Sequence, residues 1–144
     1  MRGLVPVVAS FEKCAFVVEQ DLAPGLAMNT VAALSMSVGR FVEGIVGDPV
    51  KDAEGRTHTG ITAIPLPVLR GAAADLREIV LKAAALPDVF VVDFTAVAQS
   101  SRSYDEYTDR TAQVATGDLP YVGVAVCGSK SAVNKLTGSL PLYR

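Results

Sequence analysis

Histidine is nearly absent from this chain, and its scarcity removes several kinds of catalytic site. His58 is the single histidine, and no second histidine, cysteine or acidic cluster accompanies it at the spacing of metal ligands. No nucleophile-elbow pattern that would recruit His58 into a Ser-His-Asp triad is present. No glycine-rich phosphate-binding pattern follows a predicted strand. The sequence therefore predicts no metal site and no cofactor, and we interpret His58 as a surface-loop residue.

Cysteine is scarce as well. Cys14 and Cys127 are the two cysteines, and each lies inside an apolar run typical of a buried strand. Neither has an identifiable neighbouring base or positive charge that would activate a thiol. We interpret both as buried, reduced thiols, which favours a cytoplasmic location.

Long apolar runs and an excess of positive charge are also missing. No stretch reaches the roughly 18 uninterrupted apolar residues that cross a membrane, and residues 1–10, interrupted by Pro6, are too short for a signal peptide. Thirteen lysines and arginines stand against fifteen acidic residues, for a formal charge of −2. Proteins that bind nucleic acid usually carry a basic face. The sequence therefore disfavours tRNA as a partner and predicts no contact with a membrane.

The remaining composition is that of a compact domain. Half of the 144 residues are apolar, 19% are charged, and the mean hydropathy is +0.36. Such a composition argues against disorder, and the length suits one domain. We expect a single domain over residues 1–144, with residues 1–11 as an N-terminal extension.

Strand and helix patterns alternate along the chain. Continuous apolar runs predict buried strands, and Pro65 and Pro67, which lack N–H donors on one side, predict an edge strand. An amphipathic pattern with Leu76, Ile79, Val80 and Ala83 on one side predicts a helix. The expected strands are 13–19, 61–69, 89–94 and 121–127; the expected helices are 26–38 ending at Gly39, 72–86, 103–114 and one ending at 137–138; and a hairpin or ordered loop spans 46–59. This order predicts a three-layer α/β/α domain.

Four stretches of this chain resemble an uncharacterised bacterial family that is related in fold to type-2 peptidyl-tRNA hydrolase. They are DLAPGLA at 21–27, GITAIP at 60–65, VVDF at 91–94 and LTGSLPL at 136–142. The resemblance to the hydrolase itself is concentrated at the two ends of the chain. It implies a mixed sheet of about four strands with helices on both faces, and a homodimer.

The turn after the first predicted strand departs from the hydrolase pattern Asp-Leu-Lys-Met-Gly-Lys-Gly-Lys. Asp21, Leu22 and Gly25 keep their places, whereas the three lysine positions hold other residues (Ala23, Leu26 and Met28). Without ammonium groups, this turn cannot neutralise a phosphate or polarise an ester carbonyl by charge. We therefore expect the chain to lack peptidyl-tRNA hydrolase activity.

Asp93 is the candidate catalytic residue. It lies at the end of a predicted buried strand, where open α/β sheets place ligand sites. It is one position away from the aspartate of the hydrolase stretch Asp-Ala-Gly-Arg-Thr-Gln, and Gln99 coincides with the glutamine of that stretch. Asp93 is therefore a general base, a polar anchor for a ligand, or a strand-end aspartate that accepts hydrogen bonds from loop N–H groups.

A polar cluster follows Asp93 at residues 99–104. It contains Gln99, Ser100 and Arg102, and Arg102 suits two-pronged recognition of a carboxylate or phosphate. A solvated loop that leads into a helix capped by Ser103 explains the same residues. Tyr104 and Tyr107 share one stripe of the next helix, which indicates packing on the sheet or a dimer contact.

Three functions remain open at this point. The leading hypothesis is a homodimeric protein that binds a small polar ligand in a cleft at the strand ends. The alternative is a hydrolase of peptidyl-tRNA or a related ester or amide, using Asp93 and the backbone N–H groups of residues 25–28, and the third is a structural interaction module. The predicted ligand-binding residues are Asp21, Gly25, Asn29, Gln99, Ser100 and Arg102.

Overall fold

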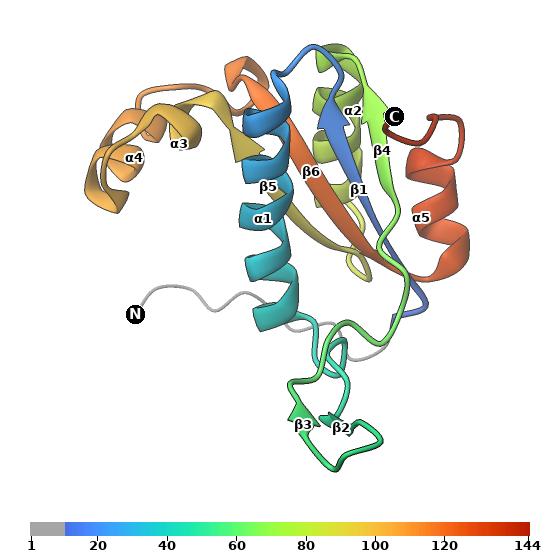
Figure 1. Ribbon diagram of the computed structural model, residues 1–144. Helices are drawn as coiled ribbons and strands as arrows, with labels where there is room; N and C mark the ends of the chain where they lie inside the picture. Colours follow the sequence, from blue (N-terminus) through green and yellow to red (C-terminus); the bar gives the residue numbers. More distant parts are fainter. Residues whose placement is uncertain (1–10) are drawn as a thin grey trace.

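A four-stranded mixed sheet forms the centre of the computed structural model, which describes residues 11–144 (Figure 1). β1 and β4 are parallel, whereas β6 is antiparallel to both β1 and β5. The strands lie side by side in the order β4-β1-β6-β5, with the bounds β1 Lys13–Glu19, β4 Val68–Gly71, β5 Phe90–Thr95 and β6 Tyr121–Gly128. The prediction of an α/β fold with a mixed sheet of about four strands is confirmed.

Helices cover both faces of the sheet (Figure 1). α1 (Pro24–Phe41) packs on one face, where its Leu34 and Val38 join Phe16 and Ala125 of the strands in one apolar cluster. On the other face lie α2 (Ala73–Ala84) and α5 (Lys130–Thr137). The buried residues of α2 are the predicted apolar set, Leu76, Ile79, Val80 and Ala83.

The close contact between α1 and the sheet depends on Gly123 in β6. A Cβ atom at this position would overlap the methyl group of Thr30 and come within 3.1 Å of Leu34 Cδ1. The backbone of Gly123 is not in the left-handed region, so the constraint on this position is space rather than conformation. The missing side chain allows α1 to lie directly on β6.

Several predicted boundaries are wrong. α1 continues past Gly39 because Leu34, Val38 and Val42 keep one buried stripe at the helical spacing of four residues. The strand predicted at 61–69 begins only at Val68, after both prolines. The helix predicted at 103–114 ends at Thr111, and the helix predicted at 72–86 spans Ala73–Ala84.

β5 is the strand whose environment was predicted incorrectly. Its apolar run indicated burial on both faces, but β5 lies at one edge of the sheet and Val91, Val92 and Phe94 are only partly buried. Asp93 lies within the strand rather than at its end, and the residue is exposed, although neighbouring protein atoms partly desolvate its carboxyl group. The polar stretch after β5 is also partly helical, because α3 (Ala96–Ser100) includes Gln99 and Ser100.

The segment at 46–59 forms the predicted hairpin. β2 (Val50–Lys51) and β3 (Thr57–His58) pair antiparallel and project from the body of the molecule (Figure 1). His58 is exposed, with its Nε2 atom 2.8 Å from a carboxylate oxygen of Asp52. The interpretation of His58 as a surface residue is confirmed.

The prediction of two reduced thiols is wrong. Cys14 and Cys127 are fully buried, as expected, but they are directly opposite each other in the β1–β6 register and form a disulfide. Their Cα atoms are 4.1 Å apart. The pairing depends on the register of two strands that are 113 residues apart in sequence, which neither cysteine reveals alone.

Two further predictions concern membrane-spanning helices and the N-terminal residues. Within residues 11–144, no helix combines the length and apolar character needed to cross a bilayer. The predicted N-terminal extension, residues 1–11, lies outside the described residues except for Phe11, which packs against the cluster under α1.

The contact at Gly123 predicts a cost for any side chain there. Gly123→Ala should lower the free energy of unfolding by about 1–3 kcal/mol, because the added methyl group forces α1 away from β6. Gly39→Ala is the matched control, since a Cβ atom at Gly39 meets nothing within 4 Å and alanine favours the helix by up to about 1 kcal/mol. Urea unfolding measures both. Equal stability of Gly123→Ala and wild type would contradict the close packing.

The disulfide predicts a stability that depends on reducing agent. Reduction should lower the free energy of unfolding by up to about 4–5 kcal/mol, because the cross-link closes a loop of more than a hundred residues in the unfolded chain. A Cys14→Ala/Cys127→Ala variant should not respond to the reductant. If the denatured, unreduced protein takes up two alkyl groups from iodoacetamide, as judged by mass spectrometry, the two cysteines are free and the disulfide is wrong.

Candidate functional site

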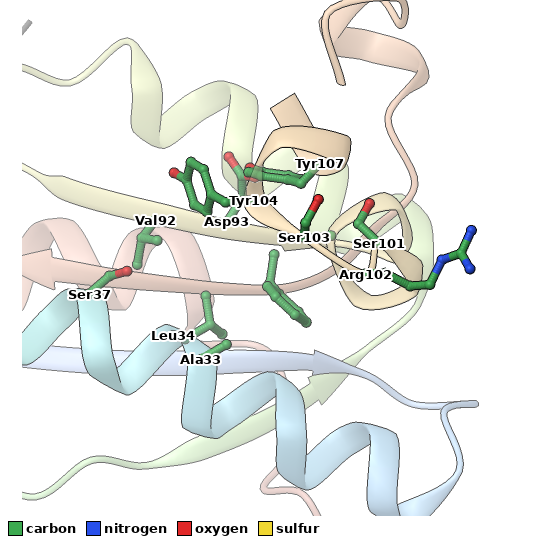
Figure 2. Close-up of a pocket in the computed structure, with 12 residues that line it drawn as sticks. Ala33, Leu34, Ser37, Val92, Asp93, Ser101, Arg102, Ser103, Tyr104 and Tyr107 are labelled. Atoms are coloured by element: carbon green, nitrogen blue, oxygen red, sulfur yellow. The ribbon is translucent and has the colours of Figure 1, made fainter. Parts of the chain in front are cut away.

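A pocket of about 430 Å³ opens where α3 and α4 (Tyr104–Thr111) leave the edge of the sheet (Figure 2). α1 forms one wall, β5 the floor, and the α3–α4 segment the other wall. The lining residues are Ala33, Leu34 and Ser37 of α1, Val92, Asp93 and Phe94 of β5, and Ala98, Ser101, Arg102, Ser103, Tyr104 and Tyr107 of the α3–α4 segment.

The two sides of the pocket differ in chemistry. Successive side chains of a strand point to opposite faces, so Val92 and Asp93 diverge (Figure 2). Val92 lies on the side of α1, with Leu34 and Ser37. Asp93 lies on the side of α4, where the side chain of Tyr107 points toward it. One side of the pocket is therefore mainly apolar, and the other presents a carboxyl group and a phenol.

The environment of Asp93 changes its ionisation. Protein atoms around its carboxyl group displace enough water to raise the pKa of Asp93 above its ordinary value of 3.8, although part of the residue remains exposed. Burial, then the charge of Asp93, then Tyr104 raise the pKa of Tyr107. Tyr107 therefore keeps its proton and offers a hydroxyl donor beside a carboxyl acceptor. A carboxyl with a raised pKa can hold or release a proton closer to neutral pH than an ordinary aspartate.

Hydrogen bonds within the α3–α4 segment hold that wall of the pocket in place. The Thr95 hydroxyl accepts a bond of 3.1 Å from the Ala98 N–H and so caps α3, and the Ser103 hydroxyl caps α4 through the Glu106 N–H, also at 3.1 Å. The second of these bonds confirms Ser103 as the predicted helix cap. The Arg110 guanidinium donates to the Ser101 hydroxyl at 3.0 Å, which joins the two helices.

Arg102 lines the pocket but does not point into it. Its side chain is 92% exposed, and its Nε atom lies 3.7 Å from a Glu106 carboxylate oxygen. Figure 2 shows the guanidinium directed away from Asp93. Recognition of an anion by Arg102 therefore requires a change of side-chain rotamer.

The structure also brings two of the predicted ligand-binding residues, Asn29 and Gln99, into contact. The Gln99 amide donates to the Leu26 carbonyl at 3.1 Å, to the Thr30 hydroxyl at 3.2 Å and, more weakly, to Asn29 Oδ1 at 3.4 Å. These bonds attach α3 to the first half of α1. Gln99 and Asn29 thus support the wall of the pocket from outside rather than line it.

The other three predicted residues lie apart from the pocket lining. Asp21 is exposed in the turn after β1, and its N–H donates to the Glu19 carboxylate. Gly25 is exposed in the first turn of α1. The Ser100 hydroxyl donates to the Ala96 carbonyl at 2.8 Å inside α3. The prediction of a single cleft containing all seven residues is not reproduced.

The sequence did not assign the tyrosines to the pocket. Tyr104 and Tyr107 form an edge-to-face pair with ring centroids 5.4 Å apart, and Tyr104 is 79% exposed. α4 has no fully buried residue, but Tyr107 is partly buried where it faces Asp93 of β5, so only Tyr107 of this pair approaches the sheet. The sequence shows only that the two tyrosines share one side of a mostly polar helix. This pattern does not distinguish residues that line a pocket from residues that pack in the core.

The described residues contain no cluster of possible metal ligands. Within residues 11–144, no group of three histidine, cysteine, aspartate or glutamate side chains lies close enough to hold a metal ion. The polar groups that line the pocket include the carboxyl group of Asp93 and the hydroxyl groups of serine and tyrosine residues. The pocket suits a ligand that donates hydrogen bonds or carries positive charge.

The raised pKa of Asp93 predicts a pH-dependent stability. Between the ordinary pKa and the raised one, the folded state holds more proton than the unfolded state, so stability falls as pH rises through that window. Asp93→Asn should therefore unfold at a higher temperature than wild type at pH 7. The gain in the free energy of unfolding should be less than about 1 kcal/mol, because the residue is partly solvated. Below pH 3.8 the difference should disappear.

Asp48→Asn serves as the control for that experiment, because it removes one charge from an exposed site before the β2–β3 hairpin. Thermal unfolding, followed by circular dichroism at a series of pH values, gives the stability of wild type, Asp93→Asn and Asp48→Asn as a function of pH. A difference between Asp93→Asn and wild type that stays constant from pH 3 to pH 7 would show that burial does not disfavour the charged carboxyl.

A solved structure has the same fold, and a family model matches the sequence. No curated protein matches the chain. A protein of unknown function from Agrobacterium tumefaciens strain C58 has a similar structure, with a TM-score of 0.83 at 20% sequence identity over 92% of this chain and 97% of that one. At this identity the likeness concerns the fold alone. A family model described as a protein of unknown function, DUF2000, matches residues 12–144. The chain therefore belongs to the DUF2000 family.

Proposed function

We propose that the protein binds a small polar ligand with a positively charged or hydrogen-bond-donating group in the pocket between α1, β5 and α4, with Asp93 as its anchor. The observation that carries this proposal is the meeting of Asp93 and Tyr107 in one pocket. A volume of about 430 Å³ lies within the range of small-molecule sites. An acceptor and a donor side by side are the groups that orient a polar ligand.

The charge around the pocket favours a cation. Residues 90–112 contain four acidic residues and two arginines, and both arginines lie beside Glu106. No lysine or arginine among residues 11–144 forms an ion pair with Asp93. A ligand ammonium would supply the missing counter-charge and favour the ionised carboxyl.

We further propose that the protein has a fold like that of type-2 peptidyl-tRNA hydrolase but does not hydrolyse peptidyl-tRNA. A mixed four-stranded sheet with helices on both faces is what the sequence resemblance implied. The turn after β1 has Ala23, Leu26 and Met28 in place of the lysines, and Glu19 and Asp21 place carboxylates there instead. A phosphate at this turn would meet negative charge.

The geometry gives no support to the alternative hydrolase. That mechanism required Asp93 to act with the backbone N–H groups of residues 25–28. The pocket that contains Asp93 meets α1 at residues 33–37, about 7 Å or more further along the helix axis. Homodimer formation is separate from this question and stays a prediction, which sedimentation of the purified protein tests.

A matched pair of small ligands tests the proposed function. Nα-acetyl-lysine amide should shift the amide NMR signals of Asp93, Ser103 and Tyr107 at millimolar concentration, whereas Nα-acetyl-norleucine amide, which lacks the ammonium group, should not. Binding should weaken at low pH, where Asp93 is protonated, and should be lost in Asp93→Asn. Asp48→Asn should bind like wild type.

Two results would contradict the proposal. One is an equal response to both amides, which would mean that the positive charge is not recognised. The other is a set of shifts that maps away from β5 and α4 or persists in Asp93→Asn.

A further inference from the structure

The pocket lies at the open edge of the sheet. Val92, Asp93 and Phe94 all line it, although these three consecutive residues point alternately to the two faces of the sheet. A pocket that meets all three must lie alongside the strand. One side of β5 is paired with β6, so the pocket lies on the other, outer side.

The two edges of the sheet differ in whether another segment pairs with the edge strand. The C-terminal segment covers the edge at β4, where the Arg70 N–H donates to the Pro141 carbonyl at 3.0 Å and the Tyr143 N–H donates to the Val68 carbonyl at 2.8 Å. At the other edge, no strand among residues 11–144 pairs with the outer side of β5. An unpaired edge presents a row of backbone N–H and C=O groups to whatever occupies the space beside it.

We infer that the ligand of this pocket is an extended peptide segment with alternating basic and apolar side chains, which adds to the sheet as a strand beside β5. This inference rests on the proposed function and names the class of its ligand. Backbone hydrogen bonds to β5 supply affinity that does not depend on sequence, and the pocket walls supply selectivity.

The two sides of the pocket explain why basic and apolar side chains should alternate in the peptide. Side chains of an added strand point in turn toward α4 and toward α1, as those of β5 do. On the side of α4 they meet the Asp93 carboxyl, within a segment where acidic residues outnumber basic ones. On the side of α1 they meet Leu34, Val92 and Phe94. Lysine or arginine suits the first side, and an aliphatic residue suits the second.

A peptide selection tests the inference on the full chain. Random heptapeptides displayed on phage are selected on the wild-type protein and counted again on Asp93→Asn and Asp48→Asn. The expected result is enrichment of sequences in which basic and apolar residues alternate, with at least tenfold weaker binding to Asp93→Asn and unchanged binding to Asp48→Asn. The synthetic peptide should shift the backbone amide signals of residues 90–95.

N-methylation of that peptide then isolates the contribution of the backbone. Methylating the N–H groups of one alternate set of residues should weaken binding at least tenfold, because those groups bond to β5, while methylating the other set should have little effect. Failure to enrich any sequence, equal effects of the two methylations, or unchanged β5 amide signals would each overturn the inference.

The outcomes also separate this inference from the proposed function. If Nα-acetyl-lysine amide binds at Asp93 but no peptide does, the pocket is a cation site and strand addition is wrong. If neither binds, both fail.

Discussion

The antiparallel pairing of β6 with β1 and β5 determines where the other elements lie. All eight residues of β6 are buried, and its position between β1 and β5 leaves β4 and β5 at the edges. Gly123 lets α1 lie directly on β6, which brings α1 close enough to β5 to form one wall of the pocket. Because the chain leaves β5 through α3 and α4, the second wall stands over the same edge. The site is thus a consequence of the strand order.

Much of the fold follows from local patterns in the sequence. The buried strand at 13–19, the amphipathic face of α2 and the cap at Ser103 were predicted because each depends on neighbouring residues alone. The strand order, and with it the exposure of β5, depends on which strands pair, and an apolar run such as 89–94 does not reveal that. The cysteine disulfide was missed for the same reason, since it requires the register between β1 and β6.

The site was predictable in part. Asp93, chosen as an acidic residue in an apolar strand predicted to be buried, does line the pocket, and Asn29 and Gln99 do meet. The predictions for Asp21, Gly25 and Ser100 assumed that the strand ends gather one cleft, whereas the pocket lies beside β5 rather than at the ends of β1 and β4. Tyr107 could not be assigned to the pocket, because its place there depends on where α4 lies relative to β5. What distinguishes the site physically is a carboxyl group desolvated at a sheet edge and left without a cationic partner among the described residues.

The proposed cation site depends above all on the ionisation of Asp93. The ¹³C chemical shift of its side-chain carboxyl carbon, followed against pH with and without Nα-acetyl-lysine amide, reports the pKa in each state. We expect a pKa above the ordinary aspartate value in the free protein and a lower one when the ammonium group is bound, because a nearby cation favours the charged form. A carboxyl that titrates like an unperturbed aspartate and does not respond to the ligand would show that Asp93 is not the anchor of a cation site.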